Sequence, residues 1–225
     1  MPSTDPIRVL VWSERTEPAD VYPNGMNRTI ADALNQRDGI LAQTAQIADP
    51  EQGLTEAALS AADVLVWWGH GRHNDVTDES VARIVRHVTA RGMGFMPLHS
   101  SHHSRAFKTL MGTSCDLGGW REDGQPSHLY VAEPSHPIAA GIPQYVVVPQ
   151  EEMYAEWFVI PPPDELVFIS SFLGGSEVFR SGCCWQRGAG RIFYFQPGHE
   201  TYPVYHQVEL QTILANGVCW TAGRS

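Results

Sequence analysis

The sequence predicts an α/β protein built on a doubly wound, mostly parallel sheet with helices on both faces. In the first half of the chain, short apolar segments alternate four times with segments of helical spacing. The apolar segments are near-continuous, as in strands that a parallel sheet buries on both faces. Three of them run into polar or histidine-bearing turns, and in such a sheet the ends of the strands are where ligands bind.

The first half contains four expected strand–helix pairs. Strands are expected at residues 7–12, 40–47, 63–68 and 95–98. Helices are expected at 26–34, 54–61 and 77–88, and a fourth follows the turn after residue 98. In the third helix Thr77 acts as a cap, and one face carries Val81, Ile84, Val85 and Val88.

The second half is less regular. Residues 112–125 are expected to form a glycine-rich loop, and 133–143 a turn region punctuated by proline. Strands are expected at 128–131, 145–148, 167–172, 181–185 and 191–195, and a closing helix at 205–220. Because neither a linker nor an internal repeat interrupts this pattern, residues 1–225 are expected to form a single domain.

Charge and composition narrow the function. The formal net charge of −10 would repel nucleic acid and anionic membranes, so a small-molecule ligand is expected instead. The chain shows neither an apolar run of the ~20 residues that span a bilayer nor the features of a signal peptide. The four cysteines form no CxxC pair, which is typical of reduced thiols in a cytoplasmic protein.

The turn after the strand at 95–98 has the highest density of potentially reactive side chains in the chain. It contains three imidazoles within five residues, His99, His102 and His103, beside the hydroxyls of Ser100, Ser101 and Ser104. A turn that leads into a helix also faces the unpaired N–H groups and partial positive charge of the helix terminus. This turn is therefore the expected centre of a ligand site.

Histidines from separate turns predict a metal site. Neutral imidazole suits zinc and other divalent ions of the first transition row, and a carboxylate commonly completes the shell. His99 and His103 are four residues apart, a spacing that shares one helix face. We expect the ligands to be His70, His99, His103 and His199, with Glu152 nearby and zinc as the ion. The alternative is a cleft lined by the same hydrogen-bonded or acid–base residues without an ion.

Two further groups are candidates for catalysis. Glu14 follows the first strand, where it could orient a partner or act as a general base, and Glu152 is considered for the same chemistry; the adjacent Glu151 is expected to be exposed. Ser100 is an alternative nucleophile, but it would need a base and an oxyanion hole. The Gly-x-Ser-x-Gly setting of serine hydrolases is absent from this turn.

Aromatic residues near the strand ends predict a sugar ligand, because sugar rings stack on aromatic faces while carboxylates and amides bind their hydroxyls. Trp67 and Trp220 are expected in the core. Arg72, beside His70, could bind an anionic group or pair with a surface carboxylate. The expected substrate-binding residues are Trp12, Trp68, Arg72, Trp120, Tyr154 and Glu200.

Several short motifs in order give a family resemblance. They are Val11-Trp-Ser-Glu14, Val66-Trp-Trp-Gly-His70, Pro97-Leu-His-Ser100, Ser135-His-Pro-Ile138, Glu151-Glu-Met-Tyr154 and Gly188-Ala-Gly-Arg-Ile-Phe-Tyr-Phe-Gln-Pro-Gly-His-Glu200. The chain resembles ThuA-like trehalose utilisation proteins, a branch of the class I glutamine amidotransferase-like superfamily. The resemblance implies a flavodoxin-like sheet. In the amidotransferases the corresponding turn bears a cysteine nucleophile; here it carries His99 and Ser100, so amidotransferase activity is not expected.

The resemblance implies utilisation of trehalose or a related disaccharide. In a 3-keto sugar the carbonyl acidifies the neighbouring C–H, so a Glu or His base with a divalent metal could drive isomerisation or elimination, and hydrolysis is a further possibility. The alternatives are a non-catalytic sugar-binding or regulatory module and a Ser100-dependent hydrolase. Scattered aromatics such as Phe158 and Phe179 would suit the interface of a homo-oligomer.

Overall fold

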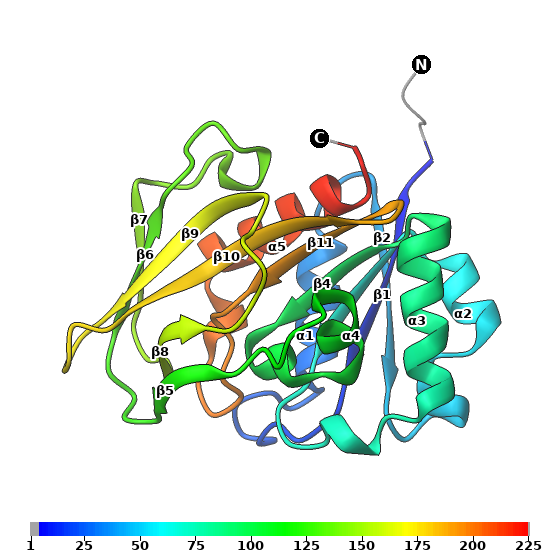
Figure 1. Cartoon of the computed structure of the whole chain (residues 1–225), viewed down its shortest axis with the longest axis horizontal. Coiled ribbons are helices and arrows are strands. Elements are labelled where there is room, and N and C mark those ends of the chain that lie inside the picture. The colour runs from blue at the N-terminus through cyan, green and yellow to red at the C-terminus, as the bar shows by residue number, and fades with distance from the viewer. Residues whose placement is uncertain (1–4, 225) are drawn as a thin grey trace.

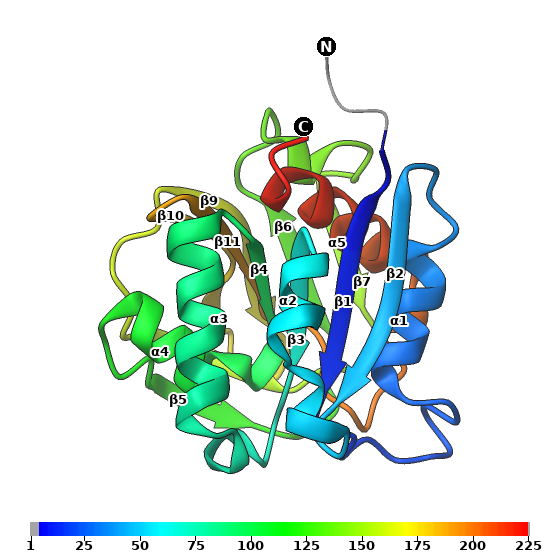
Figure 2. The same ribbon diagram turned by 90° about the vertical axis from the view of Figure 1, so that its right-hand side faces the viewer.

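The structure, a computed structural model that describes residues 5–224, is built on a nine-stranded sheet between two layers of helices (Figures 1 and 2). The first half alternates strand and helix as expected: β1 (Ile7–Ser13), α1 (Met26–Leu34), β2 (Ile40–Gln46), α2 (Glu56–Ala61), β3 (Val64–Trp68), α3 (Asp78–Arg91), β4 (Gly94–Leu98) and α4 (Arg105–Met111). The α/β fold class predicted from the sequence is confirmed.

The second half adds the strands β5 (Leu117–Arg121), β6 (Ser127–Val131), β7 (Tyr145–Val148), β8 (Met153–Phe158), β9 (Glu165–Phe172), β10 (Val178–Arg187) and β11 (Gly190–Phe195), and the helix α5 (Val208–Thr221). The order in the main sheet is β2-β1-β3-β4-β11-β10-β9-β6-β7. The strands from β2 to β11 run parallel to their neighbours, and those from β10 to β7 are antiparallel. The sheet is therefore parallel where the predicted site residues lie.

The two faces of the sheet bury separate hydrophobic cores. Helices α1 and α5 cover one face, and α2, α3 and α4 cover the other (Figure 2). Trp68 lies in the first core, while Trp12 stacks on Trp67 in the second with ring centroids 3.8 Å apart. The near-continuous apolar strands recognised in the sequence are explained by this burial from both sides.

The glycine-rich segment 112–125 is not a loop throughout, because it contains β5, which pairs with β8 in a separate two-stranded sheet. Gly118 allows this pairing. A Cβ atom there would lie 2.2 Å from the carbonyl oxygen of Glu156 and 2.5 Å from the nitrogen of Trp157. Glycine thus serves close approach of two backbones here rather than a turn. The β5–β8 ribbon lies beside the ends of the central strands (Figure 1).

Helix boundaries near the strand ends also differ from the expectation. Residues 99–103 form a short 3₁₀ helix, η3 (His99–His103), and α4 begins only after Ser104, whose side chain accepts a hydrogen bond from the Phe107 N–H. Residues Val204–His206 form another 3₁₀ turn ahead of α5. Within residues 5–224, no helix has the length and apolar composition needed to cross a membrane.

We expect Gly94→Ala to destabilise the fold, because β4 and α5 approach closely at this point. The added Cβ would lie 2.8 Å from the Cβ of Thr221 and 2.9 Å from its backbone oxygen, and backbone atoms cannot move aside. Overpacking of this kind costs about 1–3 kcal/mol, measured as the free energy of unfolding in urea. Gly119→Ala is the matched control, because its Cβ would meet only the Ala155 Cβ at 4.0 Å. Equal stability of the two variants would contradict this packing.

Candidate functional site

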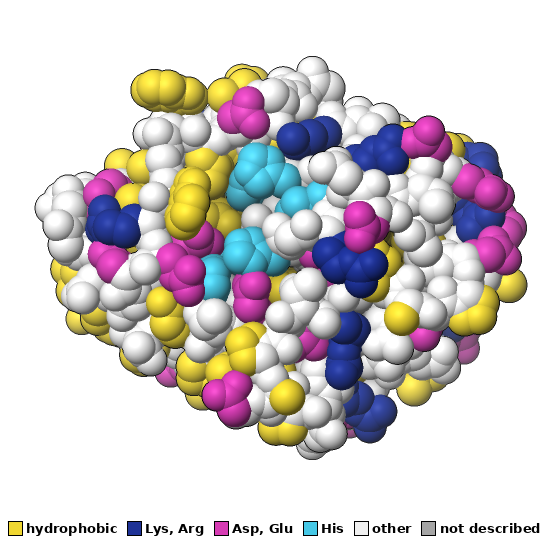
Figure 3. Space-filling model, turned by 90° about the horizontal axis from the view of Figure 1, so that it is seen from below, with side chains coloured by type: hydrophobic (Ala, Val, Ile, Leu, Met, Phe, Trp, Pro, Cys, Tyr) yellow, Lys and Arg dark blue, Asp and Glu magenta, His cyan; other side chains and the backbone are white. Residues whose placement is uncertain are grey.

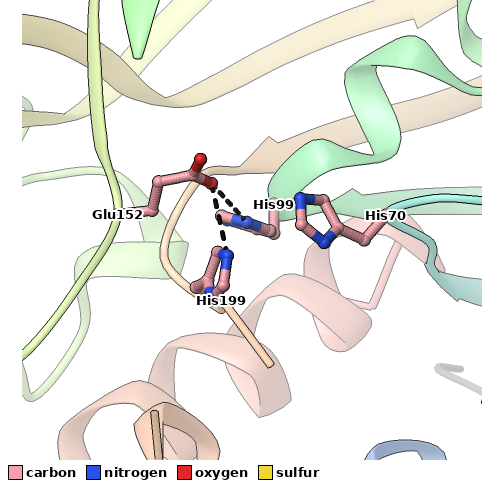
Figure 4. Close-up of side chains that lie close together, drawn as sticks. All are labelled: His70, His99, Glu152 and His199. Carbon is pink, nitrogen blue, oxygen red and sulfur yellow. Dashed lines mark ion pairs between the residues drawn. The ribbon is translucent and has the colours of Figure 1, made fainter. Parts of the chain in front are cut away.

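Four side chains converge at the carboxyl edge of the parallel strands: His70, His99, Glu152 and His199 (Figure 4). His70 follows β3, His99 follows β4, His199 follows β11, and Glu152 directly precedes β8. One nitrogen or carboxylate oxygen from each residue lies within 4.8 Å of those of the other three. We call this group the His3Glu cluster. Seen from this edge, histidine side chains gather in a hollow among hydrophobic and acidic ones (Figure 3).

His99 sits on a backbone turn that aims its ring into the cluster. Its φ of 53° lies in the left-handed region, which is uncommon for a residue other than glycine and is found at functional turns. Its ring is fully buried, with Nδ1 3.0 Å from the carbonyl oxygen of Gln196. Because a carbonyl can only accept, Nδ1 carries the proton, and Nε2 faces the Glu152 Oε2 at 3.1 Å and the Tyr154 hydroxyl at 3.3 Å.

The other two imidazoles are oriented in the same way. Nδ1 of His70 pairs with Glu200 Oε1 at 2.5 Å. Nδ1 of His199 lies 2.8 Å from the Thr201 hydroxyl and accepts a hydrogen bond from the Thr201 N–H at 3.3 Å. Nε2 of His199 is buried without a hydrogen-bond partner among the described residues, and its ion-pair contacts, Oε2 of Glu152 at 3.8 Å and Oε1 of Glu122 at 3.9 Å, lie beyond hydrogen-bond distance. Since partners on Nδ1 fix the ring orientation, the Nε2 atoms remain available to the centre of the cluster.

The charges of the His3Glu cluster shift the pKa values of its members. Burial lowers the pKa of His99, but the bond to Glu152 and the charges of Glu152, Glu151 and Glu200 outweigh it and raise the pKa to about 9. Burial raises the pKa of Glu152, but His99 outweighs this effect and the net shift is downward. Burial and the charge of His99 lower the pKa of His199. Without an ion, His99 therefore carries a second proton, on Nε2, which pairs with Glu152.

Glu151 was expected to be exposed, and this was wrong. The side chain is fully buried and accepts hydrogen bonds from the N–H groups of Gly198 at 2.8 Å, His199 at 3.2 Å and Glu152 at 2.9 Å. Burial raises its pKa to about 7. Glu151 thereby ties the loop of one cluster residue to the loop of another. Two of its partners, Gly198 and His199, are distant in sequence. The pair Glu151-Glu152 ahead of β8 was therefore the one signal of this role in the sequence.

Glu14 holds the turn after β3 and does not reach the cluster. Its Oε2 accepts hydrogen bonds from the N–H groups of His70, Gly71 and Arg72, each at 2.8 Å, and the carboxylate is almost fully buried. Burial raises its pKa, against the opposing effect of these three bonds. The expected orienting role agrees with this geometry. A general base facing substrate does not, because Oε2 is occupied by three backbone N–H groups and Oε1 is buried 3.4 Å from Nδ1 of His73.

A cavity of about 300 Å³ opens beside the His3Glu cluster. It is lined by His70, Ser100, His102, His103, Leu117, Trp120, Glu122, Glu152 and Tyr154. Trp120 is 67% exposed, so its indole offers a free face to a ligand, whereas Tyr154 is buried against His99. A larger polar depression of about 630 Å³ lies over α1 and the ends of β1 and β2, but it includes none of the cluster residues.

Several expected site residues lie elsewhere. His103 lines the cavity but is not in the cluster; its ring lies 4.0 Å from that of His102 and 6.0 Å from that of His73. The expected spacing of one helix face fails because η3 is a 3₁₀ helix, with three residues per turn. Ser100 also lines the cavity, but among the described hydrogen bonds none joins it to a histidine, so its assignment as a nucleophile loses its base.

Four of the expected substrate-binding residues do not line the cavity. Trp12 and Trp68 are fully buried, and their indole N–H groups donate to the carbonyl oxygens of Gln52 and Gly198. Arg72 is paired with Asp75 outside the cavity, at 2.8 Å. Glu200 supports His70 and does not line the cavity. Each residue follows a strand-end motif, but a strand-end position alone does not tell a core side chain from one that faces the cleft.

Phe158 and Phe179 do not support an interface between copies. Their rings stack in the core with centroids 5.0 Å apart and are 3% and 1% exposed. The expectation of a homo-oligomer therefore loses the residues on which it was based.

Comparison with known proteins identifies related sequences and folds. Residues 8–221 match the sequence model of the ThuA family, described as trehalose utilisation. A search of curated proteins finds no match. A ThuA-like protein from Parabacteroides merdae has a TM-score of 0.68 at 16% identity, over 97% of this chain and 90% of that chain. One from Bacteroides uniformis has a TM-score of 0.68 at 17% identity, over 97% and 93%.

A Salmonella typhimurium protein described as cytoplasmic is also similar, with a TM-score of 0.63 at 14% identity, over 95% of this chain and 98% of that chain. At these identities, the structural likeness shows a shared fold.

We expect Glu14→Ala to disturb the turn that carries His70. Removal of the carboxylate leaves three partly buried N–H groups without their acceptor, which costs about 3 kcal/mol in the free energy of unfolding. Glu14→Gln, the matched variant, retains one side-chain oxygen as an acceptor and is expected to lose roughly a third as much. Urea unfolding monitored by circular dichroism measures both. An unchanged free energy of unfolding in Glu14→Ala would show that the turn after β3 does not depend on this carboxylate.

We expect the metal-free protein to show a pH-dependent difference from Glu152→Gln. The pKa of His99 rises from 6.5 to about 9 on folding, so the stabilisation from its pair with Glu152 is complete below pH 6.5 and is lost as the pH rises through about 9. The pKa of Glu152 is lowered from 4.5, so its contribution is present above pH 4.5 and is lost as the pH falls through the folded value. Between pH 4.5 and pH 6.5, the free energy of unfolding of the wild-type chain should therefore exceed that of Glu152→Gln by about 3 kcal/mol.

Urea unfolding of chelator-treated protein at roughly pH 6 and pH 10 measures this difference. Glu165→Gln is the control, because Glu165 pairs with His136 at 2.9 Å outside the cluster. Wild type and Glu152→Gln that differ by the same amount at both pH values would show that His99 does not carry the proton.

Proposed function

We propose that this chain, which belongs to the ThuA family of trehalose utilisation, is a metal-dependent enzyme acting on trehalose or a related disaccharide. The family match confirms the resemblance recognised in the sequence motifs. The metal, the reaction and the substrate are our inference. The observation that carries it is the convergence of three imidazoles and one carboxylate beside a cavity with an exposed indole.

The residues of the His3Glu cluster fit a divalent ion. Three nitrogens and one oxygen are a donor set typical of zinc and its first-row neighbours, and zinc is our first candidate. The buried Nε2 of His199 has no hydrogen-bond partner among the described residues, so it is an atom that an ion would satisfy, and Oε2 of Glu152 lies 3.8 Å from it. The partners of the three Nδ1 atoms, the Gln196 carbonyl, Glu200 and Thr201, resemble the outer residues that orient histidine ligands in metal sites.

In the proposed enzyme, some residues of the site would hold the ion and others fix the loops around it. A bound divalent ion supplies a Lewis acid that polarises a carbonyl or hydroxyl oxygen. His70, His99, His199 and Glu152 would hold the ion, and Glu14 and Glu151 fix the loops that carry them. Tyr154 lines the cavity, and its hydroxyl lies 3.3 Å from Nε2 of His99, so it borders the atom that would hold the ion.

A carbohydrate suits the rest of the cavity. Trp120 offers an exposed aromatic face for the C–H face of a sugar ring, and the cavity wall offers imidazole and hydroxyl groups to its hydroxyls. A disaccharide carrying a keto group is the favoured substrate class, because a Lewis acid on the carbonyl acidifies the adjacent C–H. Isomerisation or elimination would follow from loss of that proton, and hydrolysis is the other reaction we consider.

An enzyme is favoured over a sugar-binding module. A module needs aromatic and amide contacts, whereas this site gathers four ionisable groups, three of them buried, and shifts the pKa values of His99, Glu152 and His199. We also propose a cytoplasmic location, which is supported by four free cysteines and by the description of the Salmonella typhimurium protein.

We expect the protein, purified without a histidine tag, to contain about one divalent ion per chain by elemental analysis. His99→Ala, His199→Ala and Glu152→Gln should lose the ion, and Glu200→Gln should weaken it about 10- to 100-fold because His70 loses its orienting partner. His103→Ala is the matched control, since this histidine lies on the cavity wall outside the cluster. A wild-type chain that binds neither zinc, manganese nor iron would overturn the proposal.

A further inference from the structure

His99 leaves β4 with its backbone in the left-handed region, at a φ of 53°. This conformation is unfavourable for a residue other than glycine, and it persists only where the surrounding groups hold it. The turn directs the imidazole of His99 toward Glu152 and His199 (Figure 4). Whatever holds this turn therefore also holds one member of the His3Glu cluster in place.

Two side chains hold the carbonyl group of His99. The Tyr194 hydroxyl donates a hydrogen bond to this carbonyl oxygen at 3.0 Å, and Nδ1–H of His102 donates to it at 3.2 Å. Both partners must be donors, because a carbonyl oxygen can only accept. The main chain of His99 is thus bound separately from its ring, whose Nδ1–H donates to the Gln196 carbonyl.

One strand supplies both the tyrosine and the carbonyl that binds the ring. Tyr194 lies on β11, and Gln196 follows directly after this strand. β11 runs parallel to β4, with Phe195 opposite Leu98, the residue that precedes His99. The end of β11 therefore holds His99 at two points. The ring is bound by backbone, so the tyrosine hydroxyl is the contact from β11 that a side-chain substitution can remove.

The ring of Tyr194 is fixed by packing. It is fully buried, and it contacts the rings of Phe107 and Phe158, with centroids 5.7 and 5.3 Å away. Burial also raises the pKa of Tyr194 well above its ordinary value, so the hydroxyl retains the proton that it donates. Tyr194 neither lines the cavity nor belongs to the His3Glu cluster. Its influence on the site must therefore pass through His99.

We propose that Tyr194 is a positioning residue of this site: its hydroxyl holds the left-handed turn after β4 and so keeps the His99 ring directed at the His3Glu cluster. The consequence for metal binding rests on the proposed function, whereas the consequence for the ring does not. Phenylalanine at this position would retain the packing and lose the bond. His102 alone would then hold the carbonyl, and the turn could relax toward negative φ, which moves the imidazole away from Glu152.

The alternative is that the hydroxyl contributes to general stability, as any buried hydrogen bond does. Thr221 offers a comparison far from the site. It is 2% exposed, lies in α5, and its hydroxyl donates to the Gly217 carbonyl at 2.8 Å. Thr221→Val removes this bond and keeps the shape of the side chain. It is therefore the matched control for Tyr194→Phe.

Hydrogen exchange in chelator-treated protein with isotope-labelled histidine tests the position of the ring by NMR. The His99 Nδ1–H, assigned by its loss in His99→Ala, should exchange slowly in the wild type because it is buried and bound. In Tyr194→Phe it should exchange about 10-fold faster relative to the backbone amides of β1 in the same sample, which report global unfolding. In Thr221→Val this ratio should match the wild type.

Metal affinity is the second measurement. Competition with a chromophoric chelator should show that the dissociation constant for zinc rises about 10-fold in Tyr194→Phe, as it does when outer residues of metal sites are changed. Thr221→Val should bind zinc as the wild type does. An unchanged ring exchange or an unchanged zinc affinity in Tyr194→Phe overturns the inference, and so does an equal change in Thr221→Val.

Two further outcomes are separable. If Tyr194→Phe does not fold, the wild type decides: a slowly exchanging Tyr194 hydroxyl proton in contact with the His102 ring supports the bond, and its absence overturns the inference. A wild-type chain that takes up no divalent ion removes the proposed function. The exchange measurement on metal-free protein still decides the role of Tyr194 in that case.

Discussion

Three neighbouring parallel strands, β3, β4 and β11, end in register at one edge of the sheet, and the candidate site depends on this alignment. Leu98 at the end of β4 pairs with Trp68 of β3 on one side and with Phe195 of β11 on the other. The next few residues of each strand must therefore leave the sheet side by side. Histidines placed within a few residues of these ends meet because of the hydrogen-bond ladders and not because of any sequence proximity.

Buried ionisable groups are stable only when hydrogen bonds replace the water that they lose. Two buried glutamates of this chain obtain these bonds in the same way, from backbone N–H groups. Glu14 on one side of the His3Glu cluster and Glu151 on the other are buried carboxylates, and each accepts three backbone N–H groups from loops that carry cluster residues. A buried charge without such donors would be strongly destabilising. The hydrogen bonds that stabilise the two buried carboxylates therefore also fix the loops that carry the cluster residues.

The sequence predicted the elements that have a clear period and an apolar core, including the parallel half of the sheet and the three histidines of the cluster. It predicted His70, His99 and His199 because each follows an apolar strand of the parallel half. It failed where local conformation decides: His103 was assigned by α-helical spacing, and the turn is a 3₁₀ helix. The roles of Glu151 and of the β5 strand depend on partners distant in the chain, and these cannot be read from periodicity.

The separation of the two sheets has a consequence for how such a protein diversifies. The main sheet supplies the histidines, while the small β5–β8 ribbon and its flanks supply Trp120, Glu122, Glu152 and Tyr154. The ribbon forms its own two-stranded sheet, so its sequence can change without altering the ladders that align the histidines. Substitutions at exposed ribbon residues such as Trp120 can therefore reshape the cavity wall while the three histidines and Glu152 stay in place. New substrates become accessible through such local substitutions on the two ribbon strands.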